Sequence, residues 1–333
     1  MNDLSTKKRV LSGIRATGRL HLGNYLGAVK GMLALQNSNE YETYYMVVDL
    51  HTLTTPYDKD SLKTSVRDII IDYLAAGLDP KQSALFIQSM VPQHVELAYC
   101  FSTVTTVAKM QHLTTFKDKV KQHPQNVTMA LLNYPVLMAA DILVYKAGLV
   151  PVGIDQEPHL EVAREIARRM NQDFGMDFPQ PQRFATKGEY VPSLSGEGKM
   201  SKSVEGSFIN LTDSLEEIQS KLAKAPTDSG ILGGDVPKTG GVVSLFAFLK
   251  LFGSEDAYKT YTDDYRGKRI RYGDMKAYLA QAIFAELEPL QEKRKELEAN
   301  PTYVDTVIKE GAEKARSVAQ KTVDEVKEKM GLS

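Results

Sequence analysis

Residues 8–28 read KRVLSGIRATGRLHLGNYLGA, and the expected fold is built outward from this stretch. Its first part is a short apolar run that predicts a buried strand ending near Gly13. Gly18 and the residues around Gly23 then predict a glycine-rich turn into a helix, whose free N–H groups suit an anionic ligand. The spacing matches neither a P-loop nor a dinucleotide fingerprint. From these residues alone, a plain strand–helix corner with an exposed His21 is the competing interpretation.

Strand and helix patterns alternate over the first half of the chain. Apolar and β-branched runs predict further strands at residues 43–50, 83–89 and 148–153, and helical spacing predicts helices at residues 24–36, 60–78 and 157–170. This order is typical of an α/β fold with a Rossmann-like parallel sheet and flanking helices. Such sheets bind ligands at the carboxyl ends of their strands, here after Ile14, Val48 and Val152.

The last third of the chain has a different pattern. After residue 207 we find helical spacing and a Gly/Pro-rich connection, with no strand pattern. We predict a catalytic nucleotide-binding domain at residues 1–206, with an inserted helical connection around residues 92–147. A smaller all-α domain is predicted at residues 207–333. The amphipathic segment 310–330 is expected to be the last helix and to pack back on the first domain.

The composition is ordinary for a globular protein. Of the 333 residues, 42% are apolar and 25% are charged, with a net charge of −1. Any nucleic-acid binding would therefore need a local basic patch. The single cysteine, Cys100, lies on an apolar stretch and is expected to be a buried thiol. Neither a signal region nor a membrane-spanning run is visible, so we expect a cytoplasmic protein with no membrane contact.

A second informative stretch, GEGKMSKSVEGS, occupies residues 196–207. Its KMSKS segment, together with HLGN at residues 21–24, resembles the paired signatures of the class I aminoacyl-tRNA synthetases. His21 matches the first histidine of the first signature, and Asn24 stands at the position of the second. Because both segments occur in the family's order and at its separation, the resemblance is specific.

The resemblance implies a loop that closes over ATP. Pyrophosphate is the leaving group, and Lys199 and Lys202 would meet the negative charge that builds on it. Gly196 and Gly198 would let the loop swing. A solvated basic loop is the alternative that the KMSKS segment would allow if it stood alone.

Other segments resemble the tryptophanyl-tRNA synthetases in particular. They are VVDLHTL (47–53), FIQSMVPQH (86–94), YPVLMAADIL (134–143), VPVGIDQEPHLEVARE (150–165) and EGAEKARSVA (310–319). The related tyrosyl enzymes commonly have Gln at the position of Met138, where it addresses a phenol hydroxyl together with an Asp. Here Met138 offers an apolar surface and Asp141 an acceptor, which suits the indole N–H of tryptophan. Without the resemblance, Asp141 would read as a helix carboxylate paired with a local cation.

The resemblance assigns residues to each substrate. Tryptophan is expected to contact Leu11, Tyr134, Met138, Asp141, Val150, Val152 and Gln156. ATP is expected to contact Arg15, Ala16, Thr17, Gly23, Asn24, Gly153, Ile154, Asp155, Val191, Lys199, Met200, Ser201, Lys202 and Ser203. The catalytic group that stabilises the phosphates would be His21, Asn24, Lys117, Lys199 and Lys202. No acidic cluster suggests a protein-held metal, so Mg2+ is expected to arrive on the ATP phosphates.

Some of these assignments keep a simpler alternative. Asp155 could be a helix N-cap, and Lys117 could be a surface lysine. The family usually has Gln-Pro-Ser-Gly or Arg-Pro-Thr-Gly where this chain has Arg15, Ala16, Thr17 and Gly18, which leaves the role of Arg15 open.

The implied reaction has two steps, formation of tryptophanyl-adenylate and transfer to the 3′ end of tRNA(Trp). The helical domain would read the anticodon, and the cations and tyrosines of residues 265–276 suit a single-stranded loop, although a solvated helix entry would look alike. The family implies a homodimer. Two alternatives stay open, a tyrosyl enzyme, which Met138 disfavours, and a paralogue that binds ATP or tryptophan without charging tRNA.

Overall fold

The computed structural model describes residues 7–185, 190–202, 204, 206–230, 232–237 and 239–332. Contacts within the chain define two compact units. Unit 1 comprises Met1–Gly18, Lys30–Thr186 and Asn300–Ser333, and unit 2 comprises Arg19–Val29 and Lys187–Ala299. This division differs from a single boundary at residue 206. Residues 19–29 pack with later parts of the chain, and residues 300–332 return to unit 1.

Unit 1 contains the predicted parallel sheet. Its strands are β1 (Lys8–Arg15), β2 (Tyr41–Val48), β3 (Ser83–Ile87), β4 (Leu149–Pro151) and β5 (Gln182–Phe184). Their spatial order is β3-β2-β1-β4-β5, and every neighbouring pair is parallel. The order reverses between β1 and β4, so these two carboxyl ends mark the place where such sheets bind ligands. The α/β fold class is confirmed, and β5 is a strand that the sequence did not predict.

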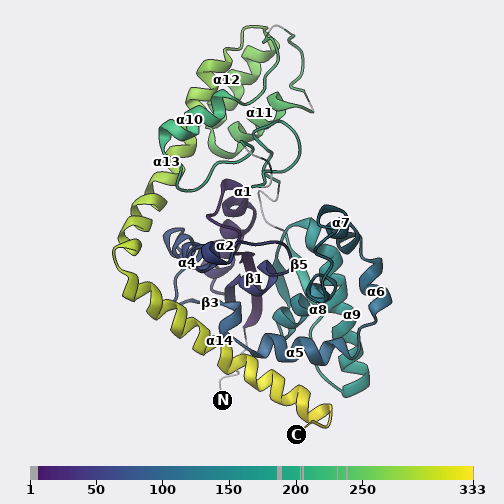
Figure 1. Cartoon of the computed structure of the whole chain (residues 1–333). Helices are drawn as coiled ribbons and strands as arrows, with labels where there is room; N and C mark the ends of the chain where they lie inside the picture. Colours follow the sequence, from purple (N-terminus) through teal and green to yellow (C-terminus); the bar gives the residue numbers. More distant parts are fainter. Residues whose placement is uncertain are drawn as a thin grey trace. The chain divides into compact units, whose positions relative to one another are not determined.

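Helices flank this sheet. They are α2 (Lys30–Asn37), α3 (Asp49–Thr52), α4 (Lys59–Ala75), α5 (Gln93–Ser102), α6 (Val107–His112), α7 (Thr114–Gln122), α8 (Met129–Leu143), α9 (Glu157–Phe174) and α14 (Pro301–Lys329). Helices α5–α8 all lie between β3 and β4 in the chain, within the predicted helical connection. In Figure 1 the last helix, α14, runs alongside β3 and α5.

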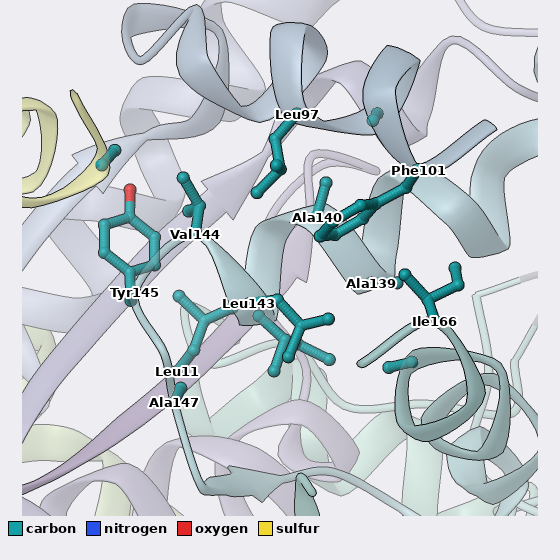
Figure 2. Close-up of a cluster of buried hydrophobic side chains, with 14 of the residues drawn as sticks. Leu11, Leu97, Phe101, Ala139, Ala140, Leu143, Val144, Tyr145, Ala147 and Ile166 are labelled. Atoms are coloured by element: carbon teal, nitrogen blue, oxygen red, sulfur yellow. The ribbon is translucent and has the colours of Figure 1, made fainter. Parts of the chain in front are cut away.

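Helix α8 lies at the centre of the hydrophobic core of unit 1. Figure 2 shows Ala139, Ala140 and Leu143 of α8 among side chains from other elements, including Phe101 of α5 and Ile166 of α9. A helix that is apolar on most of its surface is stable only when it is enclosed, as α8 is here. Cys100 belongs to the same core, so the prediction of a buried thiol is confirmed.

Unit 2 contains helices joined by long irregular segments. Its helices are α1 (Leu22–Asn24), α10 (Leu215–Ala223), α11 (Gly241–Phe252), α12 (Glu255–Arg266) and α13 (Tyr272–Glu298), with a π-helical turn at Tyr25–Val29. Helix α13 packs against both α10 and α11. Across the described part of the chain, no helix combines the length and the apolar character that crossing a membrane requires.

Candidate functional site

The KMSKS segment begins at the end of a short hairpin in unit 2. The N–H of Met200 donates to the carbonyl of Val191 at 2.8 Å, and the N–H of Ser193 donates to the carbonyl of Gly198 at 3.0 Å. The hairpin turn places Gly196 at φ 85° and Gly198 at φ 70°. Both values lie in the left-handed region that glycine adopts without strain, so the geometry of the turn itself explains these glycines.

The segment after the hairpin connects the two signatures. The N–H of Leu194 donates to the carbonyl of Ser207, and Ser207 Oγ donates to the carbonyl of Ser201 at 2.5 Å. Two residues later the chain pairs with the HLGN region, because the N–H of Leu22 donates to the carbonyl of Ile209 at 2.9 Å. These hydrogen bonds tie described residues of both signature regions into the same compact unit.

His21 is fixed at the N-terminus of α1. Its Nδ1 accepts the N–H of Gly23 at 3.0 Å, and its own N–H donates to Oδ1 of Asn24 at 3.2 Å. The side chains of His21 and Asn24 therefore cap the same helix reciprocally. Because Nδ1 accepts, a neutral His21 carries its proton on Nε2.

His21 is held in the neutral form. Burial, and after it the positive charges of Lys202 and Lys199, together lower the pKa of His21 to about 4. The effect of both lysines places them near the imidazole ring. Unit 2 therefore brings together one neutral N–H donor and two ammonium groups, which is chemistry suited to a polyphosphate.

Other predicted ATP residues in unit 2 have structural contacts. Val191 is completely buried, and its carbonyl is occupied by Met200, which is itself buried. Gly23 packs so closely against His21 that a Cβ atom there would lie 2.8 Å from the imidazole Cε1. Ser203 lies outside the described residues.

Three predicted ATP residues lie at the carboxyl end of β1 in unit 1. Arg15 donates to Oγ1 of Thr55 at 2.8 Å, and the N–H of Ala16 donates to Oγ1 of Thr52 at 3.1 Å. Burial lowers the pKa of Arg15, and its Nε is buried without a hydrogen-bond partner. Thr17 is exposed and closes the turn through its N–H, which donates to the carbonyl of Arg15.

Two lysines of α7 differ in their exposure. Lys117 is exposed on α7. Lys119, two residues further along the chain, is half-buried, and its pKa is lowered by burial and then by the charge of Arg15. Sequence analysis did not single out Lys119, because local spacing does not reveal which side of α7 is buried.

The segment after β4 forms a single 3₁₀ turn. Gly153 precedes this turn with φ −61° and ψ 161°, and Ile154 is 68% exposed. Gln156 Nε2 donates to Oδ2 of Asp155 at 2.7 Å. Asp155 makes no side-chain cap here, so the N-cap alternative for Asp155 is wrong. These exposed polar groups stand at the carboxyl end of β4, where a parallel sheet binds ligands.

The predicted apolar residues of the tryptophan pocket belong to one cluster. Leu11 and Val150 are buried core residues on neighbouring strands β1 and β4. Met138 and Val152 are partly buried and pack against the same core. Met138 and Val152 thus combine core packing with an exposed portion that a ligand can reach.

Tyr134 is anchored by a histidine that sequence analysis did not single out. The hydroxyl of Tyr134 lies 3.1 Å from Nε2 of His159, and the two rings meet edge to face. His159 is 3% exposed, and burial lowers its pKa to about 4. A neutral His159 therefore accompanies Tyr134 in unit 1, next to the apolar residues.

Asp141 is enclosed by donors from three other elements. It is 1% exposed. His51 Nε2 lies 2.8 Å from Oδ2, His94 Nδ1 lies 2.5 Å from Oδ1, and Gln88 Nε2 lies 2.8 and 2.9 Å from the two oxygens. Burial alone would raise the pKa of Asp141, but hydrogen bonds and charge from His51 and His94 lower it well below the usual range. Asp141 is therefore a buried carboxylate with acceptor character.

Sequence analysis quoted the segments that contain these donors without assigning them a role. His51 lies in VVDLHTL, and Gln88 and His94 lie in FIQSMVPQH. A histidine or glutamine that follows a parallel strand is the available signal, because such residues collect at one edge of the sheet.

The tyrosines of residues 265–276 have structural roles rather than free faces. Tyr265 is 2% exposed, and its hydroxyl donates to Asp228 at 2.9 Å. Tyr272 donates to the same carboxylate at 2.7 Å. The prediction that both rings offer stacking surfaces to a nucleic-acid loop is therefore wrong for Tyr265 and unsupported for Tyr272.

The cations of this segment divide into two groups. Arg266 pairs with Asp235, Arg269 pairs with Asp264, and Lys276 donates to backbone carbonyls of residues 223 and 225. Lys268 and Arg271 are exposed. Among the described residues, no group of three or more His, Cys, Asp or Glu side chains is arranged to hold a metal ion.

Known proteins resemble this chain along nearly its full length. Residues 4–288 match the profile of the family described as tRNA synthetases class I (W and Y). The tryptophan–tRNA ligase of Porphyromonas gingivalis is 41% identical over 97% of this chain and 99% of its own length. The tryptophan–tRNA ligase of Helicobacter pylori strain 26695 is 43% identical over 98% of this chain and 99% of its own length.

A solved structure gives the same result. The tryptophanyl-tRNA synthetase of Campylobacter jejuni, complexed with ADP and tryptophan, superimposes with a TM-score of 0.85. The two sequences are 32% identical, and the superposition includes 97% of this chain and all of the Campylobacter jejuni chain. Together with the paired signatures, these similarities show that the chain belongs to the tryptophanyl-tRNA synthetases, within the class I family of tRNA synthetases for tryptophan and tyrosine.

Proposed function

We propose that this chain catalyses tryptophan–tRNA ligation and that the residues brought together in each unit carry the reaction. The observation that carries this proposal is the clustering of His21, Lys199 and Lys202 in unit 2. A neutral N–H donor beside two ammonium groups suits a triphosphate that loses pyrophosphate. Asn24 fixes the imidazole, and Lys117, an exposed lysine of unit 1, is a further candidate for binding the ATP phosphates.

In the first step, a carboxylate oxygen of tryptophan attacks the α-phosphorus of ATP. The bond from that phosphorus to the bridging oxygen of the β-phosphate breaks, and pyrophosphate leaves. No protein nucleophile is needed, so catalysis consists of positioning and charge stabilisation. Lys199 and Lys202 stabilise the charge on the departing pyrophosphate, and His21 donates a hydrogen bond through Nε2.

The nucleotide is positioned by backbone and side-chain groups of both predicted ATP segments. Arg15 ends β1, Ala16 and Thr17 follow it, and Gly153, Ile154 and Asp155 follow β4. In unit 2 the corresponding groups are Gly23, Asn24, Val191, Met200 and Ser201. Mg2+ would be carried by the ATP phosphates, since the described residues offer cations here rather than a cage of carboxylates.

Tryptophan selection rests on Asp141 and the apolar residues near it. Asp141 accepts the indole N–H, while Met138, Val150, Val152 and Leu11 supply apolar surface, and Tyr134 and Gln156 hold the rest of the amino acid. Phenylalanine lacks the N–H donor. A site that is built to bond that donor discriminates strongly against an analogue without it.

In the second step, the 2′-hydroxyl of the terminal ribose of tRNA(Trp) attacks the adenylate carbonyl carbon and AMP leaves. The exposed cations Lys268 and Arg271 are available to the tRNA backbone. We also propose that the protein acts in the cytoplasm, as a homodimer. The apolar side chains of Tyr99 and Val95 support the dimer, because they lie one turn apart on α5 and are 78% and 52% exposed. Light scattering after size-exclusion chromatography measures the oligomeric state.

The test is ATP–pyrophosphate exchange with each of the twenty amino acids, on purified protein without tRNA. Exchange with tryptophan alone is the expected result. Replacing Lys199 with Met should lower the rate of exchange by roughly 100-fold or more, because it removes a cation that meets developing charge. Lys224→Met is the matched control, since Lys224 is an exposed lysine outside the signatures of the same unit.

Other outcomes would replace the proposal. Exchange with tyrosine would keep the chemistry and overturn the pocket assignment. ATP binding without exchange for any amino acid would identify a paralogue that does not activate its ligand.

A further inference from the structure

The carboxylate of Asp141 is fully occupied in this structure. Oδ1 receives Gln88 at 2.8 Å and His94 at 2.5 Å, and Oδ2 receives Gln88 at 2.9 Å and His51 at 2.8 Å. A carboxylate has about four acceptor positions. An incoming indole N–H must therefore replace one existing contact, and the contacts that remain decide how Asp141 is oriented and charged.

His94 differs from the other two donors in what lies behind it. It is completely buried, and its second nitrogen, Nε2, lies 2.8 Å from the hydroxyl of Tyr145. Burial raises the pKa of Tyr145 well above its usual value, and the charge of Asp141 raises it further. Tyr145 therefore stays protonated, and its hydroxyl donates a hydrogen bond to Nε2 of His94. This leaves Nδ1 of His94 as the protonated nitrogen facing Asp141.

Tyr145 is itself held in place by packing. Its ring stacks on Tyr44 with centroids 4.6 Å apart and meets Phe86 edge to face at 5.9 Å. Tyr44 donates its hydroxyl to Glu42 at 2.6 Å, and Glu42 pairs with Arg9. Two titratable side chains, His51 and His94, contact Asp141 directly. Behind His94 lie Tyr145, then Tyr44 and the Glu42–Arg9 pair.

We propose that His94 is a positioning residue for tryptophan selection, with Tyr145 fixing its tautomer. This inference rests on the proposed function and deepens it. His94 keeps Asp141 ionised and in one rotamer, so that an oxygen is presented to the indole N–H as an acceptor. The indole N–H would take the place of the neutral Gln88 amide, whose Nε2 lies 2.8 and 2.9 Å from the two oxygens.

This role of His94 predicts that tryptophan binding depends on pH. Without the N–H of His94, burial would favour the protonated form of Asp141. A protonated carboxyl presents an O–H donor in the place where the indole N–H needs an acceptor. Loss of His94 should therefore weaken tryptophan binding, and the loss should grow as the pH falls.

The experiment uses the fact that this chain contains no tryptophan. The fluorescence of bound L-tryptophan can thus be followed against tyrosine alone, by titration of the whole protein at a series of pH values. His94→Leu should raise the Kd for tryptophan by roughly 10–100-fold, and Tyr145→Phe by roughly 3–10-fold, with the affinity for ATP changed by less than about 2-fold. In His94→Leu the acid loss of tryptophan binding should begin at a higher pH than in the unmodified chain.

Two further variants separate positioning from packing. His94→Asn keeps an N–H donor near the position of Nδ1 and should restore much of the affinity that His94→Leu loses. Tyr44→Phe removes a hydroxyl from the ring stacked on Tyr145, but that hydroxyl points to Glu42 rather than to His94. Tyr44→Phe should therefore bind tryptophan as the unmodified chain does.

The outcomes are distinct. If the unmodified chain does not bind or activate tryptophan, the proposed function fails. If it does, and both Tyr145→Phe and His94→Leu keep its affinity and pH profile, the role of His94 is wrong. Equal weakening of ATP and tryptophan binding, or no rescue by Asn, would mean that His94 acts only in packing. Should His94→Leu not fold, Tyr145→Phe still decides, because it removes only a hydroxyl group from the core.

Discussion

Gly23 is the residue that sets the position of the imidazole of His21. A Cβ atom on Gly23 would lie 2.8 Å from Cε1 and 2.9 Å from Nδ1 of that ring. Gly23→Ala should therefore turn the ring away, and the rate of ATP–pyrophosphate exchange should fall by roughly 10–100-fold. Stability should change by no more than about 1 kcal/mol, because alanine also favours a helix.

The control for this substitution is Gly273→Ala. Gly273 lies in the first turn of α13, and an added Cβ there meets nothing within 4 Å. Its exchange rate should stay within about 2-fold of the unmodified value. An unchanged rate in Gly23→Ala would show that the observed orientation of His21 is not needed for catalysis.

At the scale of elements, α14 closes the open edge of the sheet. Gly311 lies against β3 so closely that a Cβ atom would be 1.9 Å from the carbonyl oxygen of Leu85. Gly311→Ala must separate the helix from the strand, and we expect it to lower the free energy of unfolding by at least about 2 kcal/mol. Denaturant titration measures the change.

Gly148→Ala is the matched substitution, because an added Cβ at Gly148 has nothing within 4 Å. It should change the free energy of unfolding by less than about 0.5 kcal/mol. If the two alanine variants were equally stable, the close contact between α14 and β3 would not hold in solution.

At the scale of the whole molecule, two buried histidines predict a loss of stability in acid. The folded pKa values of His21 and His159 are lowered to about 4, in both cases first by burial. Between pH values of about 6.5 and 4 the unfolded chain therefore binds more protons than the folded chain. The contribution of each histidine to the free energy of unfolding is therefore complete above this window. It is lost as the pH falls through the window, by up to about 3 kcal/mol for each histidine.

His159→Gln tests one of these two contributions. Glutamine cannot titrate, and its amide can still reach the hydroxyl of Tyr134. The free energy of unfolding of this variant, measured by denaturant at several pH values, should depend less steeply on pH than that of the unmodified chain. Equal slopes would mean that His159 does not titrate differently on folding.

Local patterns predicted most of the sheet but not all of its elements. Strands β1 to β4 were expected from apolar runs, whereas β5 spans only Gln182–Phe184 and has no alternating pattern. Residues 19–29 were assigned to the first domain because they follow β1 directly. They pack in unit 2 instead, through hydrogen bonds to residues 209–211 that lie far along the chain.

The sequence by itself determined the fold class and the two signatures, because strand and helix periodicity and a five-residue motif are properties of contiguous residues. It also pointed to Asp141 and Met138 as the selective pair. Only the tertiary structure decided that Asp141 is enclosed by His51, Gln88 and His94, that Lys119 is half-buried within reach of the charge of Arg15, and that Tyr265 is buried. The physical reason is that these contacts join residues separated by tens of positions, and their geometry is set by how helices pack on the sheet rather than by any local pattern.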